Sequence, residues 1–147
     1  MLARTDADAN GLSAQEALVC TMVLVAATGG GISDREIGVM AGLVQTLPVF
    51  SDFTSAQLDA ATEAAIGLLR EENGLKHAAK LIRDALEPRL RETAYALACD
   101  VVAADGFVAQ DSLRLLEFVK TELRIDSLLA AAIERGARAR HQRVVQA

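Results

Sequence analysis

The residues of this chain that could do chemistry are four carboxylates at two helical corners. Asp105 and Gly106 end an apolar helical run, and Asp111 lies in the opening turn of the next helix. Asp34 and Glu36 begin an earlier helix, just after a run of glycines. Carboxylate oxygens are preferred ligands of hard divalent cations such as Ca²⁺ and Mg²⁺. The corners therefore admit a divalent-metal site, although they lack the loop pattern of a tight calcium site.

Each of these acids also has a purely structural explanation. Glu36 stands where a capping-box glutamate belongs, and Asp34 and Asp111 lie in first helical turns, where negative charge is favourable. Asp105 is expected at a helix C-terminus, where a carboxylate costs up to ~1 kcal/mol unless a cation, a basic side chain or an Asp-turn hydrogen bond compensates. Asp100 is rotated roughly 140° from Asp105 on the helix and is a poor co-ligand. Metal ligation and local capping both remain open.

Other catalytic chemistry finds little support in the sequence. His77 and His141 lack paired ligands at metal-binding spacing, and we expect both at the surface. Cys20 and Cys99 lie inside apolar runs, which is typical of small buried hydrophobic residues. No combination of nucleophile, base and orienting acid can be assembled with these spacings. We therefore expect a protein that is not an enzyme.

The elements that position the corners are helices. The composition is 52% hydrophobic with no Trp, one Tyr and four Phe, and the abundant Ala and Leu favour helix. Ser13 with Glu16 and Ser33 with Glu36 form capping boxes, and Asp126 is a further N-cap. The sequence predicts an all-α fold of about seven helices, covering about residues 13–28, 34–47, 55–73, 75–86, 88–105, 108–123 and 126–133.

An internal repeat relates the two corners. With an offset of 76 residues, Ile32 falls on Val108 and Gly30 on Gly106, and the flanking apolar positions also correspond. The two segments look like copies of one helix-turn-helix hairpin. Such copies tend to pack as a pseudo-symmetric pair. We expect one bundle in which the two turns lie close together.

Charge and hydropathy limit the class of protein. A net charge of −5 and a pI near 5.0 argue against nucleic-acid binding. The apolar run 17–27 is too short to cross a bilayer and has no basic segment before it, so we expect a cytoplasmic protein that does not insert into membranes. We divide the chain into a flexible N-terminus (1–12), a helical domain (13–134) and a basic tail (135–147) with four arginines.

One helix ends in Ala-x-Asp-Gly, a hydrophobic residue follows two positions after the Gly, and an acidic residue lies in the first turn of the next helix. Together with a second, related hairpin near the N-terminus, this pattern resembles the TerB (tellurite resistance protein B) family. Asp105, Gly106, Val108 and Asp111 carry this resemblance, which extends over about residues 13–134. It implies an all-helical bundle linked to tellurite and other chemical-stress responses. It also implies association with the membrane protein TerC and divalent-metal binding by the acidic cluster.

The family's acidic positions are only partly kept. In the second hairpin the aspartate is Asp105, but the glutamate position falls on Ser112, with Asp111 beside it. In the first hairpin the aspartate position is Gly29, whereas the glutamate is kept as Glu36. Two independent metal sites are therefore not expected. The resemblance implies at most one shared cluster, formed by Asp105, Asp111, Glu36 and Asp34.

Two functions follow from these observations. The first is a non-enzymatic TerB-like module of the stress response, with a weak site for Ca²⁺ or Mg²⁺ on its acidic turns. Its partner would be a TerC-like membrane protein or another stress-response protein, and it would work in the cytoplasm, peripheral at the inner face of the membrane. The alternative is a structural protein-interaction domain without metal, in which every acid is a cap or a turn residue.

Overall fold

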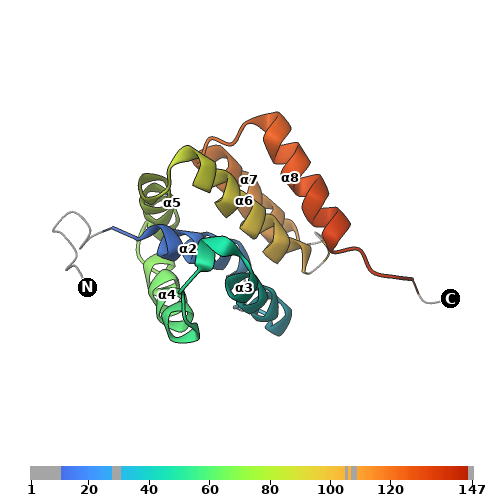
Figure 1. Cartoon of the computed structure of the whole chain (residues 1–147). Helices are drawn as coiled ribbons and strands as arrows, with labels where there is room; N and C mark the ends of the chain where they lie inside the picture. The colour runs from blue at the N-terminus through green and yellow to red at the C-terminus, as the bar shows by residue number, and fades with distance from the viewer. Residues whose placement is uncertain (1–10, 28–30, 105, 107–108, 146–147) are drawn as a thin grey trace.

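The fold of the chain is all-α. The computed structural model describes residues 11–27, 31–104, 106 and 109–145, and these residues form helices and no strand (Figure 1). The elements, in chain order, are α2 (Ala14–Ala26), α3 (Asp34–Thr46), the short 3-10 helix η1 (Pro48–Phe50), α4 (Ser55–Leu69), α5 (Gly74–Ala85), α6 (Pro88–Ala103), α7 (Gln110–Glu122) and α8 (Ser127–Arg140). The predicted fold class is confirmed.

The helices begin where the sequence predicts N-caps. The hydroxyl of Ser13 accepts a hydrogen bond from the amide of Glu16, and Ser33 and Glu36 repeat this arrangement at the start of α3. The carboxylate of Asp126 accepts hydrogen bonds from the first amides of α8. Caps satisfy amides that have no partner inside the helix. The three predicted starts are therefore correct.

The helix ends are less predictable. α2 ends at Ala26 and α6 at Ala103, each slightly before its expected end. α4 ends at Leu69, whereas Asn73 adopts the left-handed conformation (φ 58°) and leads directly into α5 at Gly74. The Asn-Gly pair therefore begins α5 and does not extend α4 to residue 73.

Helix α2 is the centre of the bundle. Every residue from Ala17 to Ala26 is buried. The one hydroxyl in this run, on Thr21, donates a hydrogen bond to the carbonyl oxygen of Ala17 at 2.7 Å, so no buried polar atom is left unsatisfied there. Helices α3, α4, α5, α6 and α7 all contact α2, and the contact with α6 is the most extensive (Figure 1). A helix that is apolar on all sides must be enclosed in this way.

The predicted repeat corresponds to two helix pairs, α2–α3 and α6–α7. Adding 76 to residues 34–46 of α3 gives 110–122, the bounds of α7. The first helices of the two pairs, α2 and α6, pack directly against each other. The hairpins are therefore neighbours in space as well as copies in sequence.

Helix α8 packs on the far side of α6 from α2 (Figure 1). The buried hydroxyl of Tyr95 on α6 donates a hydrogen bond to the carboxylate of Glu134 on α8. Burial, reinforced by this hydrogen bond, raises the pKa of Tyr95 well above its usual value. α8 continues through Arg140, so residues 135–140 of the basic segment are helical.

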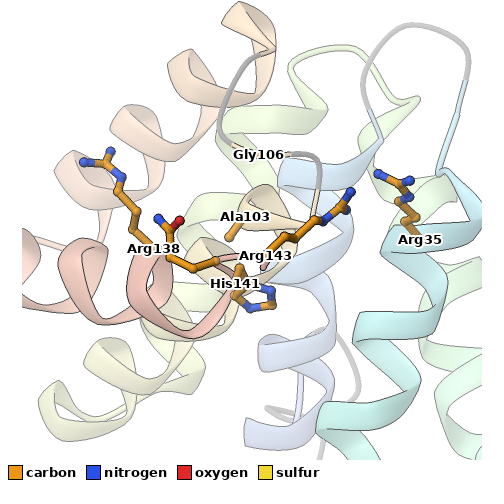
Figure 2. Close-up of a pocket in the computed structure, with 7 residues that line it drawn as sticks. Arg35, Ala103, Gly106, Arg138, His141 and Arg143 are labelled. Atoms are coloured by element: carbon orange, nitrogen blue, oxygen red, sulfur yellow. The ribbon is translucent and has the colours of Figure 1, made fainter. Parts of the chain in front are cut away.

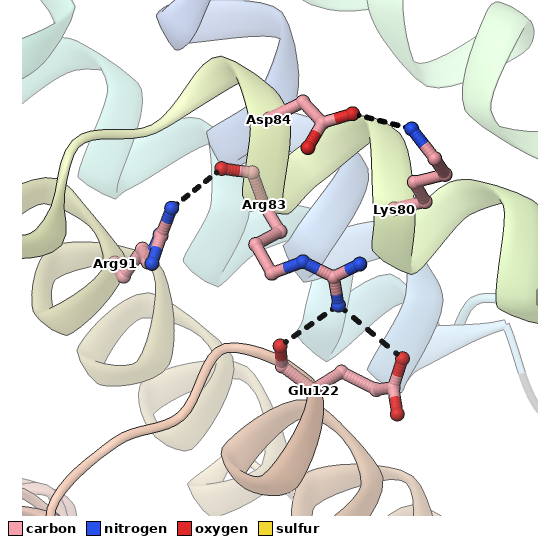
Figure 3. A network of polar contacts seen from close by, with 5 residues as sticks. All are labelled: Lys80, Arg83, Asp84, Arg91 and Glu122. Carbon is pink, nitrogen blue, oxygen red and sulfur yellow. Dashed lines mark hydrogen bonds and ion pairs between the residues drawn. The ribbon is translucent and has the colours of Figure 1, made fainter.

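A polar network joins α5 to α6 and α7 (Figure 3). Arg83 donates a hydrogen bond to the carbonyl oxygen of Glu122 at 3.2 Å and pairs with its carboxylate at 3.7 Å. Arg91 donates to the carbonyl oxygen of Arg83 at 3.1 Å. At the surface, Lys80 donates a hydrogen bond to Asp84 and thereby lowers the pKa of that carboxyl. The arginines satisfy carbonyls at helix ends, where cations are favourable.

None of the helices in the described ranges is long and apolar enough to cross a membrane.

The junction between α4 and α5 yields a stability prediction. A Cβ atom added at Gly74 would lie 2.4 Å from the carbonyl oxygen of Leu68, whereas one added at Gly67 would meet nothing within 4 Å. Gly74→Ala should therefore lower the free energy of unfolding by about 1–3 kcal/mol through overpacking. Gly67→Ala should raise it by about 0.5–1 kcal/mol, as expected at an open helical position. Urea unfolding measures both, and equal effects of the two variants would contradict this close contact.

Candidate functional site

The predicted metal-ligating carboxylates do not form a cluster among the described residues. Asp34 and Asp111 are exposed in the first turns of α3 and α7. Glu36 is buried, and its Oε1 atom accepts the backbone N–H of Ser33 at 2.8 Å, so the capping role is real. Asp105 lies outside the described residues.

A metal ion needs several donors that converge on one point. Within the part of the chain that the structure describes, no group of three or more Asp, Glu, His or Cys side chains could hold an ion. Asp34, Glu36 and Asp111 therefore do not make a metal site by themselves. A site on these turns would need the carboxylate of Asp105 in addition.

The described residues do form a pocket where the two hairpins meet the end of α8 (Figure 2). Its volume is about 380 Å³. The first hairpin contributes Arg35 from the opening turn of α3, and the second contributes Ala103 and Gly106. The rest of the described lining comes from the end of α8 and the residues after it, namely Arg138, His141, Gln142 and Arg143. The start of α3 and the end of α6, which belong to the two copies of the repeat, thus border one space.

The turn after α6 depends on glycine. Gly106 has φ 80°, in the left-handed region, and its amide donates to the carbonyl oxygen of Ala103 at 2.9 Å. A residue without Cβ adopts this conformation without strain. Gly106 therefore ends α6 tightly and forms part of the pocket wall.

A buried carboxylate holds the end of α8 in place. The side chain of Asp100 on α6 is only 9% exposed, and its Oδ1 atom accepts hydrogen bonds from Arg140 Nη2 at 2.7 Å and Nε at 3.2 Å. His141 Nε2 lies 3.2 Å from the same oxygen. Because an ionised carboxylate only accepts hydrogen bonds, Nε2 carries the proton in this contact. This three-residue clamp brings the residues after α8 to the pocket.

The described lining of the pocket is cationic. Arg35, Arg138 and Arg143 contribute guanidinium groups, and no carboxylate, hydroxyl or thiol belongs to the lining residues that the structure describes. Guanidinium groups bind carboxylates and phosphates through paired hydrogen bonds. The pocket is therefore suited to binding a negatively charged group. These lining residues supply no nucleophile.

The sequence interpretation missed the clamp. We expected His141 at the surface, but its side chain is 27% exposed and bonded to Asp100, whereas His77 is about half exposed and lies 3.4 Å from Glu71 at the surface. One signal was available, since Asp100 stands in the apolar run 97–104 and a buried carboxylate requires a partner. Its partner follows 40 residues later, beyond the reach of local pattern analysis.

Both thiols are inert by burial. Cys20 and Cys99 are buried and free, as expected from their apolar surroundings. Burial raises the pKa of each thiol to about 12. A thiol is nucleophilic only as the thiolate, so neither cysteine can act as a nucleophile near neutral pH.

Comparison with known protein families gives a match over most of the chain. The family model described as Tellurite resistance protein TerB matches residues 15–135, which include both hairpins and most of α8. No curated protein and no solved structure matches the chain.

The buried thiols predict a pH dependence. The folded thiols of Cys20 and Cys99 ionise near pH 12 instead of the usual 9.0, so the unfolded chain holds fewer protons between these values. The free energy of unfolding should therefore fall as pH rises from 9 towards 12. In the native protein at pH 8, Ellman's reagent should label both thiols slowly, and in urea it should label them at once. Rapid labelling of the native protein would contradict the burial.

The clamp predicts a local loss of stability. Asp100→Asn removes the charge that Arg140 and His141 share, and we expect a loss of about 1–2 kcal/mol, limited by the half-exposed guanidinium. Hydrogen exchange should accelerate in the last turn of α8. Asp59→Asn, at an exposed position on α4, should change the free energy of unfolding by no more than about 0.5 kcal/mol and should leave hydrogen exchange in α8 unchanged. Unchanged exchange in Asp100→Asn would show that the clamp does not hold α8.

Proposed function

The chain belongs to the TerB family of tellurite resistance proteins, and on that premise we propose that it is a non-enzymatic binding module in the response to tellurite and related chemical stress. The observation that carries this proposal is the pocket between the start of α3, the end of α6 and the end of α8. Ligand sites commonly occur as clefts between packed elements of a bundle. The surface around this pocket is the proposed working surface.

A binding role is better supported than a catalytic one. Both cysteines are buried, with pKa values raised to about 12. His141, which borders the pocket, is bonded to Asp100, and no described residue beside it in the lining carries a hydroxyl or thiol for it to activate. Nucleophilic catalysis requires such a pair within hydrogen-bond reach. We therefore propose that the module works by binding alone.

A weak divalent-cation site on the acidic turns belongs to the same proposal. Asp34 and Asp111 are exposed, and neither forms a hydrogen bond or ion pair with the described residues. Glu36 uses Oε1 for its cap and has Oε2 as a second oxygen. With Asp105 these carboxylates would offer oxygen ligands only, which suits Ca²⁺ or Mg²⁺. Because the capping bond already engages Glu36, we expect low affinity.

The alternative function is a protein-interaction domain that binds no metal. One observation favours it: Leu128 and Leu129, adjacent residues in the first turn of α8, are 82% and 44% exposed. Neighbouring exposed leucines are a common feature of protein contact surfaces. In this alternative Glu36 and Asp126 act only as helix caps.

The proposed partner is a TerC-like membrane protein or another protein of the stress response. Binding to such a partner would place the module in the cytoplasm, at the inner face of the membrane. This proposal rests on the family relationship.

Calorimetric titration distinguishes the two functions. Ca²⁺ or Mg²⁺ added to the full chain should release or absorb heat that saturates and should raise the melting temperature. Asp105→Asn should abolish both effects because it removes the carboxylate that the cluster requires. Asp59→Asn, which removes an equal charge at an exposed position on α4, should leave both unchanged.

Heats no larger than dilution, with an unchanged melting temperature, would exclude the cation site and leave the interaction domain. If Asp59→Asn and Asp105→Asn weaken cation binding equally, the cation is attracted only by the overall charge of the protein and not by a specific site.

A further inference from the structure

We propose that Arg35 and Arg143 bind a small oxyanion of the phosphate class in the pocket between the hairpins and the end of α8. This site goes beyond the proposed cation site, because it uses guanidinium groups instead of carboxylates. It would recognise an inorganic phosphate ion or the phosphate group of a small ester. The inference rests on the placement of these two arginines and on the chemistry of the pocket between them.

The two arginines come from distant parts of the chain and face the same space. Arg35 belongs to the first turn of α3, and Arg143 follows the end of α8. Figure 2 shows both side chains at this pocket, with that of Arg143 extending in the direction of Arg35. The fold therefore brings two positive charges together, although more than a hundred residues separate them in the sequence.

Neither of these arginines has a counterion in the described structure. Within the described ranges, Arg35 and Arg143 form no hydrogen bond and no ion pair. Two like charges held at one pocket repel each other. An anion between them would convert this repulsion into two attractions.

The other cations at this surface have different roles. Arg140 and His141 are bonded to Asp100 and hold the end of α8. The side chain of Arg138 points away from Arg35 and Arg143 in Figure 2. The pair formed by Arg35 and Arg143 is therefore the part of the cationic lining that is best placed to receive a ligand.

The size and chemistry of the pocket favour a small anionic ligand. Its volume of about 380 Å³ lies near the lower end of the range for small-molecule sites, roughly 300–1,000 Å³. The planar guanidinium group matches the geometry of phosphate oxygens and donates two parallel hydrogen bonds. The side-chain amide of Gln142, also in the lining, supplies additional N–H donors. A cation would find no carboxylate among these described lining residues.

The test is a titration of the full chain with sodium phosphate at constant ionic strength, followed by amide and arginine Nε–H NMR signals. We expect saturable shifts at Arg35, Arg143 and the turn at Gly106. Arg35→Gln and Arg143→Gln should each weaken binding by about tenfold or more, as expected for loss of a charge-assisted hydrogen bond. The double variant should show no saturable shift.

A matched control separates this site from a general charge effect. Arg70→Gln removes the same charge at an exposed position at the end of α4, outside the pocket lining. It should bind phosphate as the unmodified chain does. All these positions are exposed, so circular dichroism should report unchanged folding in every variant.

Two further ligands identify the source of the phosphate group. Glycerol 3-phosphate presents a soluble monoester, and vesicles of phosphatidylcholine with phosphatidic acid present one on a lipid surface. If the unmodified chain binds one of these two ligands and the double variant does not, the result supports the site. The ligand that binds then shows whether the phosphate group comes from a soluble ester or from a lipid. Absence of saturable shifts with all three ligands, or equal weakening by Arg70→Gln, would overturn the proposal.

Discussion

The constraint on which the whole structure depends is the complete burial of α2. A helix that is apolar on all sides gains its stability only when other helices enclose it. Five helices meet this requirement, and α6, its counterpart in the repeat, makes the most extensive contact with it. Because α2 and α6 pack together, the start of α3 and the end of α6 come to the same region. The proximity of Arg35 to Gly106 at one pocket is a consequence of this packing.

The second determinant is the carboxylate of Asp100. Placing a charge on the buried part of α6 is costly unless the charge is paired and hydrogen-bonded. Arg140 and His141 provide that pairing from the end of α8, while Tyr95 and Glu134 join the same two helices elsewhere. The contacts that stabilise the end of α8 therefore also position the residues that follow it, Gln142 and Arg143. The pairing of Asp100 therefore both stabilises the packing of α8 and determines which residues line the pocket.

The parts of this structure that the sequence predicts are those decided locally. Ser33 and Glu36 cap α3 through contacts three residues apart, so the capping box identifies the helix start. The close packing at the junction of α4 and α5, where a Cβ atom at Gly74 would lie 2.4 Å from the carbonyl oxygen of Leu68, is not visible in the apolar pattern of either helix. The offset of the repeat was also visible, because both copies keep their apolar positions.

The site itself was much harder to predict. The sequence pattern points to carboxylates, whereas the arginines and the histidine of the described pocket lining come from α3 and from the end of α8 with the residues that follow it. Arg35 and Arg143 line the same pocket only because α2, α6 and α8 are stacked in that order. Nothing in the surroundings of either arginine in the sequence indicates the other. The buried Asp100 was the one available clue that the basic segment would fold back onto α6.

The most direct measurement is a crystal structure of the full chain grown with sodium selenate, an analogue of small oxyanions, with anomalous data recorded at the selenium edge. We predict an anomalous peak within hydrogen-bonding distance of the guanidinium groups of both Arg35 and Arg143, with Asp100 still bonded to Arg140. A pocket open to solvent in the crystal, with no peak and with the two guanidinium groups turned apart, would contradict the assignment of this surface as an anion site.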